Sequence, residues 1–216
     1  MSKISKITFH LCDLNADLID QWKLYFGDHS NFTFHHGDIF KVYEDLKTSN
    51  QNIGLVSPAN SFGELSGGID LLYLHYFGYR LEEEIQNKIV KEKDGELIVG
   101  DAFIVDLPDY IKGYFIVAPT MRIPMNICGT VNVYLAFRAI LIALKDSDIT
   151  HVIVPGLGTG IGEVPPEVCA KQMYHAYSKI LNPDKSILDL MVYHQEHLGL
   201  VNLTKISDLP SNHTVI

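Results

Sequence analysis

The chain is poor in cysteine and has no long hydrophobic run. Its three cysteines, Cys12, Cys128 and Cys169, are far apart and form no C-x-x-C pair, which argues against a disulfide framework and against a zinc ribbon. No segment approaches the ~20 consecutive apolar residues of a membrane span, and the N-terminus has no apolar signal core. We therefore expect a cytoplasmic protein that does not enter membranes.

Positive charge is also scarce. The formal net charge is −9, and arginine occurs only at Arg80, Arg122 and Arg138, which argues against broad binding of nucleic acid or of an anionic membrane surface. An anionic ligand would have to be held by backbone amides. The ten histidines show no metal-ligand spacing, and His35 and His36 would point to opposite faces of a strand. We therefore expect neither a metal nor a cofactor.

Apolar segments with strand character alternate with amphipathic segments along the 216 residues, 47% of which are hydrophobic. This alternation predicts an α/β domain in which helices cover both faces of a largely parallel or mixed sheet. The tail from Gln195 either packs as a cover or is loosely ordered. We expect strands at 6–11, 32–36, 53–57, 97–105, 114–118, 152–154 and 187–193, and helices at 16–26, 39–47, 69–77, 80–93, 131–145 and 166–181.

Residues 54–70 are the most informative segment and read GLVSPANSFGELSGGID. An apolar strand ends in a loop with Gly63, Gly67 and Gly68, and a helix then begins near Ile69. Glycines let a backbone approach a ligand closely, and a helix N-terminus attracts anions such as phosphate. Neither G-x-G-x-x-G nor a P-loop is present. Alone, the segment fits an anion site and a plain strand-to-helix turn about equally well.

A second glycine loop follows a buried strand far downstream. Residues 151–167 read HVIVPGLGTGIGEVPPE, in which alternate positions from 156 to 162 are glycine. Pro165 and Pro166 then favour a helix start. Ligands of open α/β sheets bind at the carboxyl ends of strands, which is where both loops are expected. The two loops together indicate a clamp for one extended anionic ligand.

These segments resemble the macro domain, an ADP-ribose-binding module. The first loop is similar to the family pattern V-N-A-A-N-x-x-L-x-G-G-G-G-V-D, and the second, 158–165, to S-T-G-I-Y-G-x-P. Gly37-Asp38-Ile39 is similar to the family's G-D-I. The resemblance covers about residues 31–194. It implies a three-layer α/β/α macro-type domain with a central mixed, mostly parallel sheet, so that 1–216 is one domain with an N-terminal strand–helix extension and a C-terminal tail.

Three positions depart from the family pattern. Ser57 stands where the family usually has its first asparagine, and Pro58 replaces a small residue and stiffens the loop. Gly162 stands where the family usually has an aromatic residue that shields the distal ribose. Phe62 or Tyr73 would be candidates for a replacement surface. The change at Gly162 bears directly on whether the site is catalytic.

The resemblance also implies roles for single residues. Asp38 would accept a hydrogen bond from the adenine amino group beside the Ile39 backbone, although an aspartate here is also typical of a helix cap. Asn60 would contact the distal ribose, although asparagine also suits a loop bridge. Asp70 would position or activate water at that ribose, although the helix dipole alone also favours a carboxylate at this place.

Backbone N–H groups of the second loop would wrap the pyrophosphate, and Ile69 and Ile161 would either close over it or belong to the core. The predicted catalytic residues are Asn60 and Asp70. The predicted ligand-binding residues are Asp38, Ile39, Asn60, Gly67, Gly68, Ile69, Asp70, Gly158, Thr159, Gly160, Ile161 and Gly162.

Two functions stay open at this point. As an enzyme, the chain would hydrolyse a bond at the anomeric carbon of the distal ribose, releasing ADP-ribose from a modified protein or phosphate from ADP-ribose 1''-phosphate. As a reader, it would bind ADP-ribose or an ADP-ribosylated protein without chemistry. Asp70 favours the enzyme, whereas the missing aromatic at Gly162 favours the reader. A related nucleotide such as a cyclic ADP-ribose is a third candidate ligand.

Overall fold

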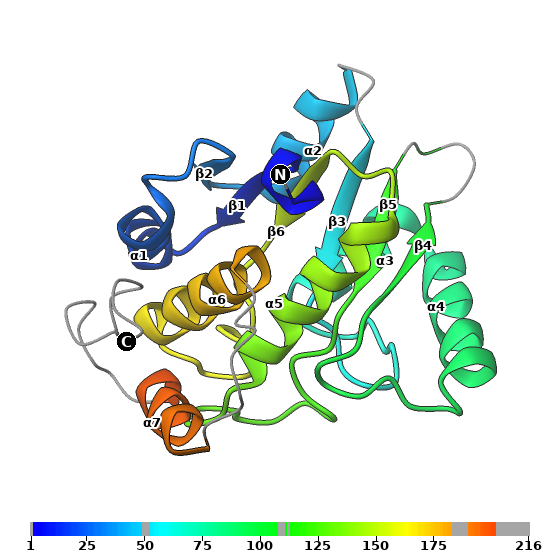
Figure 1. Cartoon of the computed structure of the whole chain (residues 1–216). Helices are drawn as coiled ribbons and strands as arrows, with labels where there is room; N and C mark the ends of the chain where they lie inside the picture. Colours follow the sequence, from blue (N-terminus) through cyan, green and yellow to red (C-terminus); the bar gives the residue numbers. More distant parts are fainter. Residues whose placement is uncertain (1, 49–51, 108–110, 112, 183–189, 202–216) are drawn as a thin grey trace.

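One six-stranded sheet runs through the middle of the molecule (Figure 1). The computed structural model describes residues 2–48, 52–107, 111, 113–182 and 190–201. Within them the strand order is β2-β1-β6-β3-β5-β4, and every neighbouring pair is parallel except the antiparallel pair β5–β4. The expected mixed, mostly parallel sheet is confirmed. The strands are β1 (Thr8–Asp13), β2 (Phe32–His36), β3 (Ile53–Ser57), β4 (Phe103–Asp106), β5 (Tyr114–Val117) and β6 (His151–Val154).

Helices cover both faces of this sheet and complete three layers (Figure 1). One buried apolar cluster joins one sheet face to α1, α5 and α6, and a second joins the opposite face to α2, α3 and α4. The three-layer α/β/α architecture is therefore confirmed. The helices are α1 (Ala16–Phe26), α2 (Ile39–Thr48), α3 (Gly68–Phe77), α4 (Tyr79–Glu92), α5 (Asn132–Ala143), α6 (Pro166–Leu181) and α7 (Leu190–Val201), with short 3-10 helices at Lys3–Lys6 and Leu144–Asp146.

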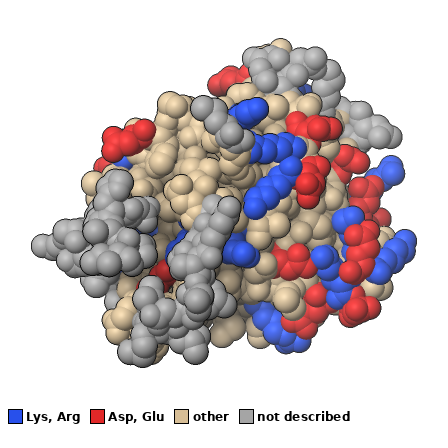
Figure 2. All heavy atoms as spheres, in the orientation of Figure 1, with Lys and Arg blue, Asp and Glu red and all other residues tan. Residues whose placement is uncertain are grey.

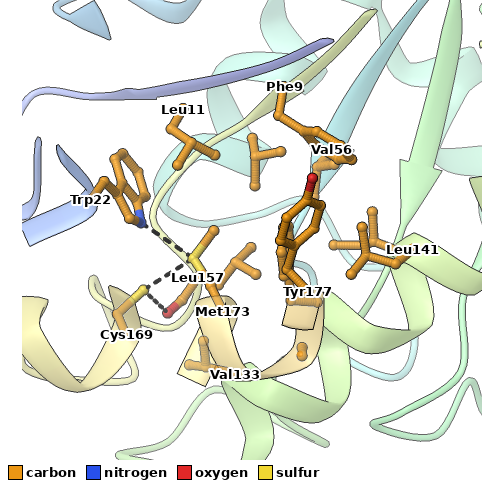
Figure 3. Close-up of a cluster of buried hydrophobic side chains, with 14 of the residues drawn as sticks. Phe9, Leu11, Trp22, Val56, Val133, Leu141, Leu157, Cys169, Met173 and Tyr177 are labelled. Atoms are coloured by element: carbon orange, nitrogen blue, oxygen red, sulfur yellow. Dashed lines mark hydrogen bonds between the residues drawn. The ribbon is translucent and has the colours of Figure 1, made fainter. Parts of the chain in front are cut away.

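The first cluster shows how the sequence builds the core (Figure 3). Alternate residues of β1, Phe9 and Leu11, point to the same face because side chains alternate along a strand. Trp22 of α1 donates its indole N–H to the Met173 sulfur at 3.3 Å, which fixes α1 against α6. Burial raises the pKa of the neighbouring Cys169 thiol to about 12, so this cysteine is a packing residue.

Two expected strands need correction. The strand expected at 97–105 forms only from Phe103, because Gly100 has φ of +100° and interrupts extended backbone before it. Of the last expected strand, 187–193, residues 187–189 lie outside the described part of the chain. Its remainder, Leu190 to Tyr193, is the first turn of helix α7. A short apolar run fits a strand or a buried helix equally well, which explains the wrong assignment.

Helix α7 packs on α6 through polar contacts. The Glu196 carboxylate lies 2.9 Å from His175 Nε2 and 2.8 Å from Lys179 Nζ, two residues one turn apart on α6. The Gln172 side chain also donates to the Leu200 carbonyl at 3.1 Å. As far as Val201 the tail therefore packs as a cover, and the rest of the tail lies outside the described residues.

Charge gathers on the side of the molecule that α4 occupies (Figure 2). Lysine and arginine alternate there with acidic residues, and the pairs Arg80–Glu84 and Lys88–Glu92 are spaced for ion pairing along one helix face. This face is solvated, as the charged pattern predicts. In the part of the chain that is described, no helix has both the length and the apolar character needed to cross a bilayer.

Candidate ligand-binding site

A cavity of about 990 Å³ lies at the carboxyl ends of β1, β2, β3 and β6. Its walls come from the turns that follow these strands, from residues after β5 and from the starts of α1, α2 and α3. In a parallel sheet these ends meet at one edge, so segments far apart in sequence converge there. Every residue predicted for the ligand site lines this cavity, namely Asp38, Ile39, Asn60, Gly67, Gly68, Ile69, Asp70, Gly158, Thr159, Gly160, Ile161 and Gly162.

The cavity wall carries carboxylates but no cationic side chain. Among the described residues that line it there is no lysine, arginine or histidine. Anion binding would therefore depend on backbone N–H groups and helix dipoles, as the scarcity of arginine led us to expect.

Asn60 braces the first loop from within. Its side-chain oxygen accepts from the backbone N–H of Phe62 at 3.0 Å and of Glu64 at 3.4 Å, and its amide donates to the Glu64 carbonyl at 3.0 Å. This is the loop bridge that was left open for asparagine at this position. The contact of Asn60 with a ribose stays a prediction. The second hydrogen of the Asn60 side-chain amide remains for such a contact.

The first loop ends at an uncapped helix N-terminus. Gly67 is the N-cap of α3 and supplies no side-chain cap, and Gly68 follows with φ of +58°. A Cβ added at Gly68 would meet nothing within 4 Å, so conformation rather than space requires glycine there. The first N–H groups of α3 are thus left to the cavity, which is the arrangement that anion sites use.

The second loop reaches across the cavity to the first. Ile161 is 51% exposed, and its Cδ1 atom would lie 3.2 Å from a Cβ placed at Gly67. Gly158 has φ of +69°, whereas a Cβ at Gly160 would meet nothing within 4 Å. The two glycine loops therefore flank one narrow passage, with Ile161 above it. Ile161 is a cavity residue, not a core residue.

Gly162 has no room for a side chain. A Cβ there would lie 2.4 Å from the Gly158 carbonyl oxygen and 2.8 Å from an Ile127 side-chain atom. The aromatic residue typical of the family pattern would not fit this loop conformation. Neither proposed replacement lines the cavity: Tyr73 is buried and donates to the Val56 carbonyl, and Phe62 lies under the Arg122 guanidinium, 5.2 Å from it.

Asp38 caps the start of α2 at one end of the cavity. Its carboxylate accepts from the Phe40 backbone N–H at 2.9 Å, and the side chain is exposed. Asp13, at the end of β1, was not predicted as a site residue. It accepts from the Asn15 N–H at 2.8 Å and from the Gly156 N–H at 3.0 Å, and thereby ties β1 to the second loop. The sequence signal that could have identified Asp13 as a site residue was its place as an acidic residue close to the end of an expected strand.

Asp70 is a buried carboxyl group on the cavity wall. The residue is 8% exposed and lies in the first turn of α3. Burial raises the pKa of Asp70 to about 7, against a hydrogen bond from Ser57 that acts in the opposite direction. Near neutral pH the group therefore exists in both charge states, which suits proton transfer.

A row of three histidines lies outside the cavity. His10 Nδ1 is 3.2 Å from His35 Nε2, and His10 Nε2 is 3.0 Å from His151 Nδ1. Burial, followed by the charges of these two neighbours, lowers the pKa of His10 to about 4. In the described part of the chain, no group of three or more His, Cys, Asp or Glu residues is arranged to hold a metal ion.

These features and the sequence pattern define the class of protein. Residues 56–173 match the Macro domain family, so the chain belongs to that family and the resemblance is confirmed.

The chain is similar to proteins of known sequence and of known structure. An uncharacterized protein of Aquifex aeolicus (strain VF5) is 32% identical over 126 residues, which cover 58% of this chain and 72% of that protein. The macrodomain of Mycobacterium tuberculosis DarG has the same fold, with a TM-score of 0.50 and 21% identity over 59% of this chain and 82% of that chain. Thermosipho africanus DarTG in complex with ADP-ribose gives a TM-score of 0.47 and 17% identity, covering 68% of this chain and 46% of that chain.

Proposed function

We propose that the chain binds ADP-ribose, or a group that carries it, and hydrolyses a bond at the anomeric carbon of the distal ribose. The observation that carries this proposal is the convergence of all predicted site residues on one cavity between two glycine loops. Membership of the Macro domain family supports the choice of ADP-ribose as the ligand.

The ligand would lie across the ends of the strands. Adenine would sit near Asp38 and Ile39, after β2, and the pyrophosphate in the passage between the glycine loops. Backbone N–H groups at the start of α3 would hold its negative charge. The distal ribose would then lie near Asp70. A diphosphate fits this passage better than a single phosphate because both loops can contact it.

Asp70 would supply the chemistry at the ribose. In the proposed step a water oxygen bonds to the anomeric carbon, the bond from that carbon to the leaving oxygen breaks, and the carboxylate accepts a proton from the water. The raised pKa of Asp70, about 7, makes it both a competent base and, once protonated, a competent acid. The leaving group would be the side chain of the modified protein, freed of ADP-ribose, or phosphate.

A reader without catalysis is the second candidate function. Gly162 excludes a side chain over the ribose, and the Asn60 amide is largely occupied within its own loop. Both observations leave the distal ribose with fewer protein contacts than it would have in a site that follows the family pattern, and this favours binding without catalysis. Binding in the same cavity would be retained.

Calorimetry with ADP-ribose tests binding, and AMP is the matched control because it lacks the second phosphate and the distal ribose. We expect ADP-ribose to bind more tightly than AMP, and equal affinities would contradict the proposed diphosphate passage.

Product analysis then separates the two functions. ADP-ribosylated proteins and ADP-ribose 1''-phosphate would be incubated with the protein and with an Asp70→Ala variant. Release of ADP-ribose or phosphate by the wild type alone supports the hydrolase. Binding without release from any of these substrates identifies a reader.

A further inference from the structure

A serine lies directly behind the buried carboxyl group of the cavity. Ser57 is the last residue of β3 and Asp70 is in the first turn of α3. The Ser57 hydroxyl donates to Asp70 Oδ1 at 2.5 Å. Ser57 is 0% exposed and does not line the cavity, whereas Asp70 does. Any effect of this serine on a ligand would therefore pass through Asp70.

No other described side chain competes for the Asp70 carboxyl group. Tyr73 is buried one turn further along α3, but its hydroxyl donates to the Val56 carbonyl at 3.2 Å. Asp70 Oδ1 is bound by Ser57, and Asp70 Oδ2 has no hydrogen-bond partner among the described residues. The two oxygens of one carboxyl group are thus in different surroundings, with Oδ2 left for the cavity.

We propose that Ser57 is a positioning residue that holds Asp70 Oδ1, so that proton gain, proton loss and ligand contact take place at Oδ2. A serine hydroxyl has one proton to donate and can hold Oδ1 whether or not Oδ2 carries a proton. The Asp70 carboxyl group already has this orientation in the protein without a ligand. The proposal rests on the proposed function only for the identity of the ligand that meets Oδ2.

Carbon-13 NMR of the Asp70 carboxyl carbon in the ligand-free protein tests the orientation. The wild type would be titrated beside Ser57→Ala, Ser57→Thr and Ser57→Cys variants. Ser61→Ala is the matched control, because Ser61 is also buried, four residues away, and its hydroxyl has no hydrogen-bond partner among the described residues.

In Ser57→Ala we expect the titration midpoint of Asp70 to rise by about one to two pH units, since the hydrogen bond that is lost is stronger to the charged carboxylate than to the neutral acid. Ser57→Thr should stay near the wild type because it keeps the hydroxyl. Ser57→Cys should shift in the same direction by less, since a thiol is a weak donor, and it decides the matter if the alanine variant does not fold. An unchanged midpoint in the alanine or cysteine variant overturns the proposal.

ADP-ribose titrations across pH then test the consequence for the ligand. We expect the pH at which affinity changes to move in Ser57→Ala together with the carboxyl midpoint, and to stay in place in Ser61→Ala. A purely structural role would lower affinity equally at every pH and would contradict the proposal. If the wild type does not bind ADP-ribose, the proposed function fails, while the ligand-free titration still decides the role of Ser57.

Discussion

Replacing Asp70 by asparagine should stabilise the protein at neutral and alkaline pH. Asparagine keeps the oxygen that accepts from Ser57 and removes a charge that is costly to bury. The folded-state pKa of Asp70 is about 7, against an ordinary value of 3.8. The folded state therefore binds more protons between these values, and wild-type stability falls as pH rises through this window. At 1.36 kcal/mol per pH unit, the difference reaches about 4 kcal/mol.

Urea denaturation at pH 8 and at pH 5 measures this effect. Trp22, the single tryptophan, is fully buried and reports unfolding by its fluorescence. We expect Asp70→Asn to raise the free energy of unfolding by about 4 kcal/mol at pH 8 and by clearly less at pH 5. Asp20→Asn, on the exposed surface of α1, is the control. A variant that is no more stable than the wild type at pH 8 would refute the reasoning.

Three further substitutions test other parts of the structure. Gly160→Val should abolish ADP-ribose binding in calorimetry and leave the melting temperature nearly unchanged, because its side chain enters the cavity without meeting protein atoms. Gly162→Ala should lower the melting temperature, because its Cβ would lie 2.4 Å from the backbone of Gly158; an unchanged melting temperature would mean that the loop adapts. The folded-state pKa of His10 is lowered to about 4, so the free energy of unfolding of the wild type should fall by up to about 3 kcal/mol as pH falls from 6.5 to 4. His10→Asn should lose less stability over this pH range in denaturation experiments. Equal pH dependence in both proteins would exclude that histidine as the cause.

Both glycine loops could be predicted because their signals are local. A buried strand, a cluster of glycines and a helix start occur within about fifteen residues, and each depends on the backbone preferences of its own residues. The start of α1 depends on an equally local preference, because asparagine favours the N-cap position and the Asn15 side chain accepts from the Asp17 and Leu18 N–H groups. The parallel sheet then follows from the alternation of elements, which places both loops at one edge.

Contacts between distant residues could not be predicted in the same way. The hydrogen bond from Ser57 to Asp70 depends on how α3 turns back over β3, and in the sequence Ser57 was visible only as a departure from the family pattern. The closed surroundings of Gly162 come from the Gly158 carbonyl and from Ile127, which no spacing rule connects. Only the first turn of helix α7 was predicted as a strand, as part of 187–193, because the contacts of α7 with α6 are not encoded in that short apolar run.

The bond between Asp13 and Gly156 has a consequence for how the protein acquires its ligand. It joins residues 143 positions apart, beside the parallel pair β1–β6. Pairing across such a separation is slow to form, because a long loop must close before the contacts stabilise it. The second glycine loop is therefore anchored only after β1 and β6, which are the first and last strands in sequence, have paired. Ligand affinity would appear late in folding and would signal, during refolding, that β1 and β6 have paired.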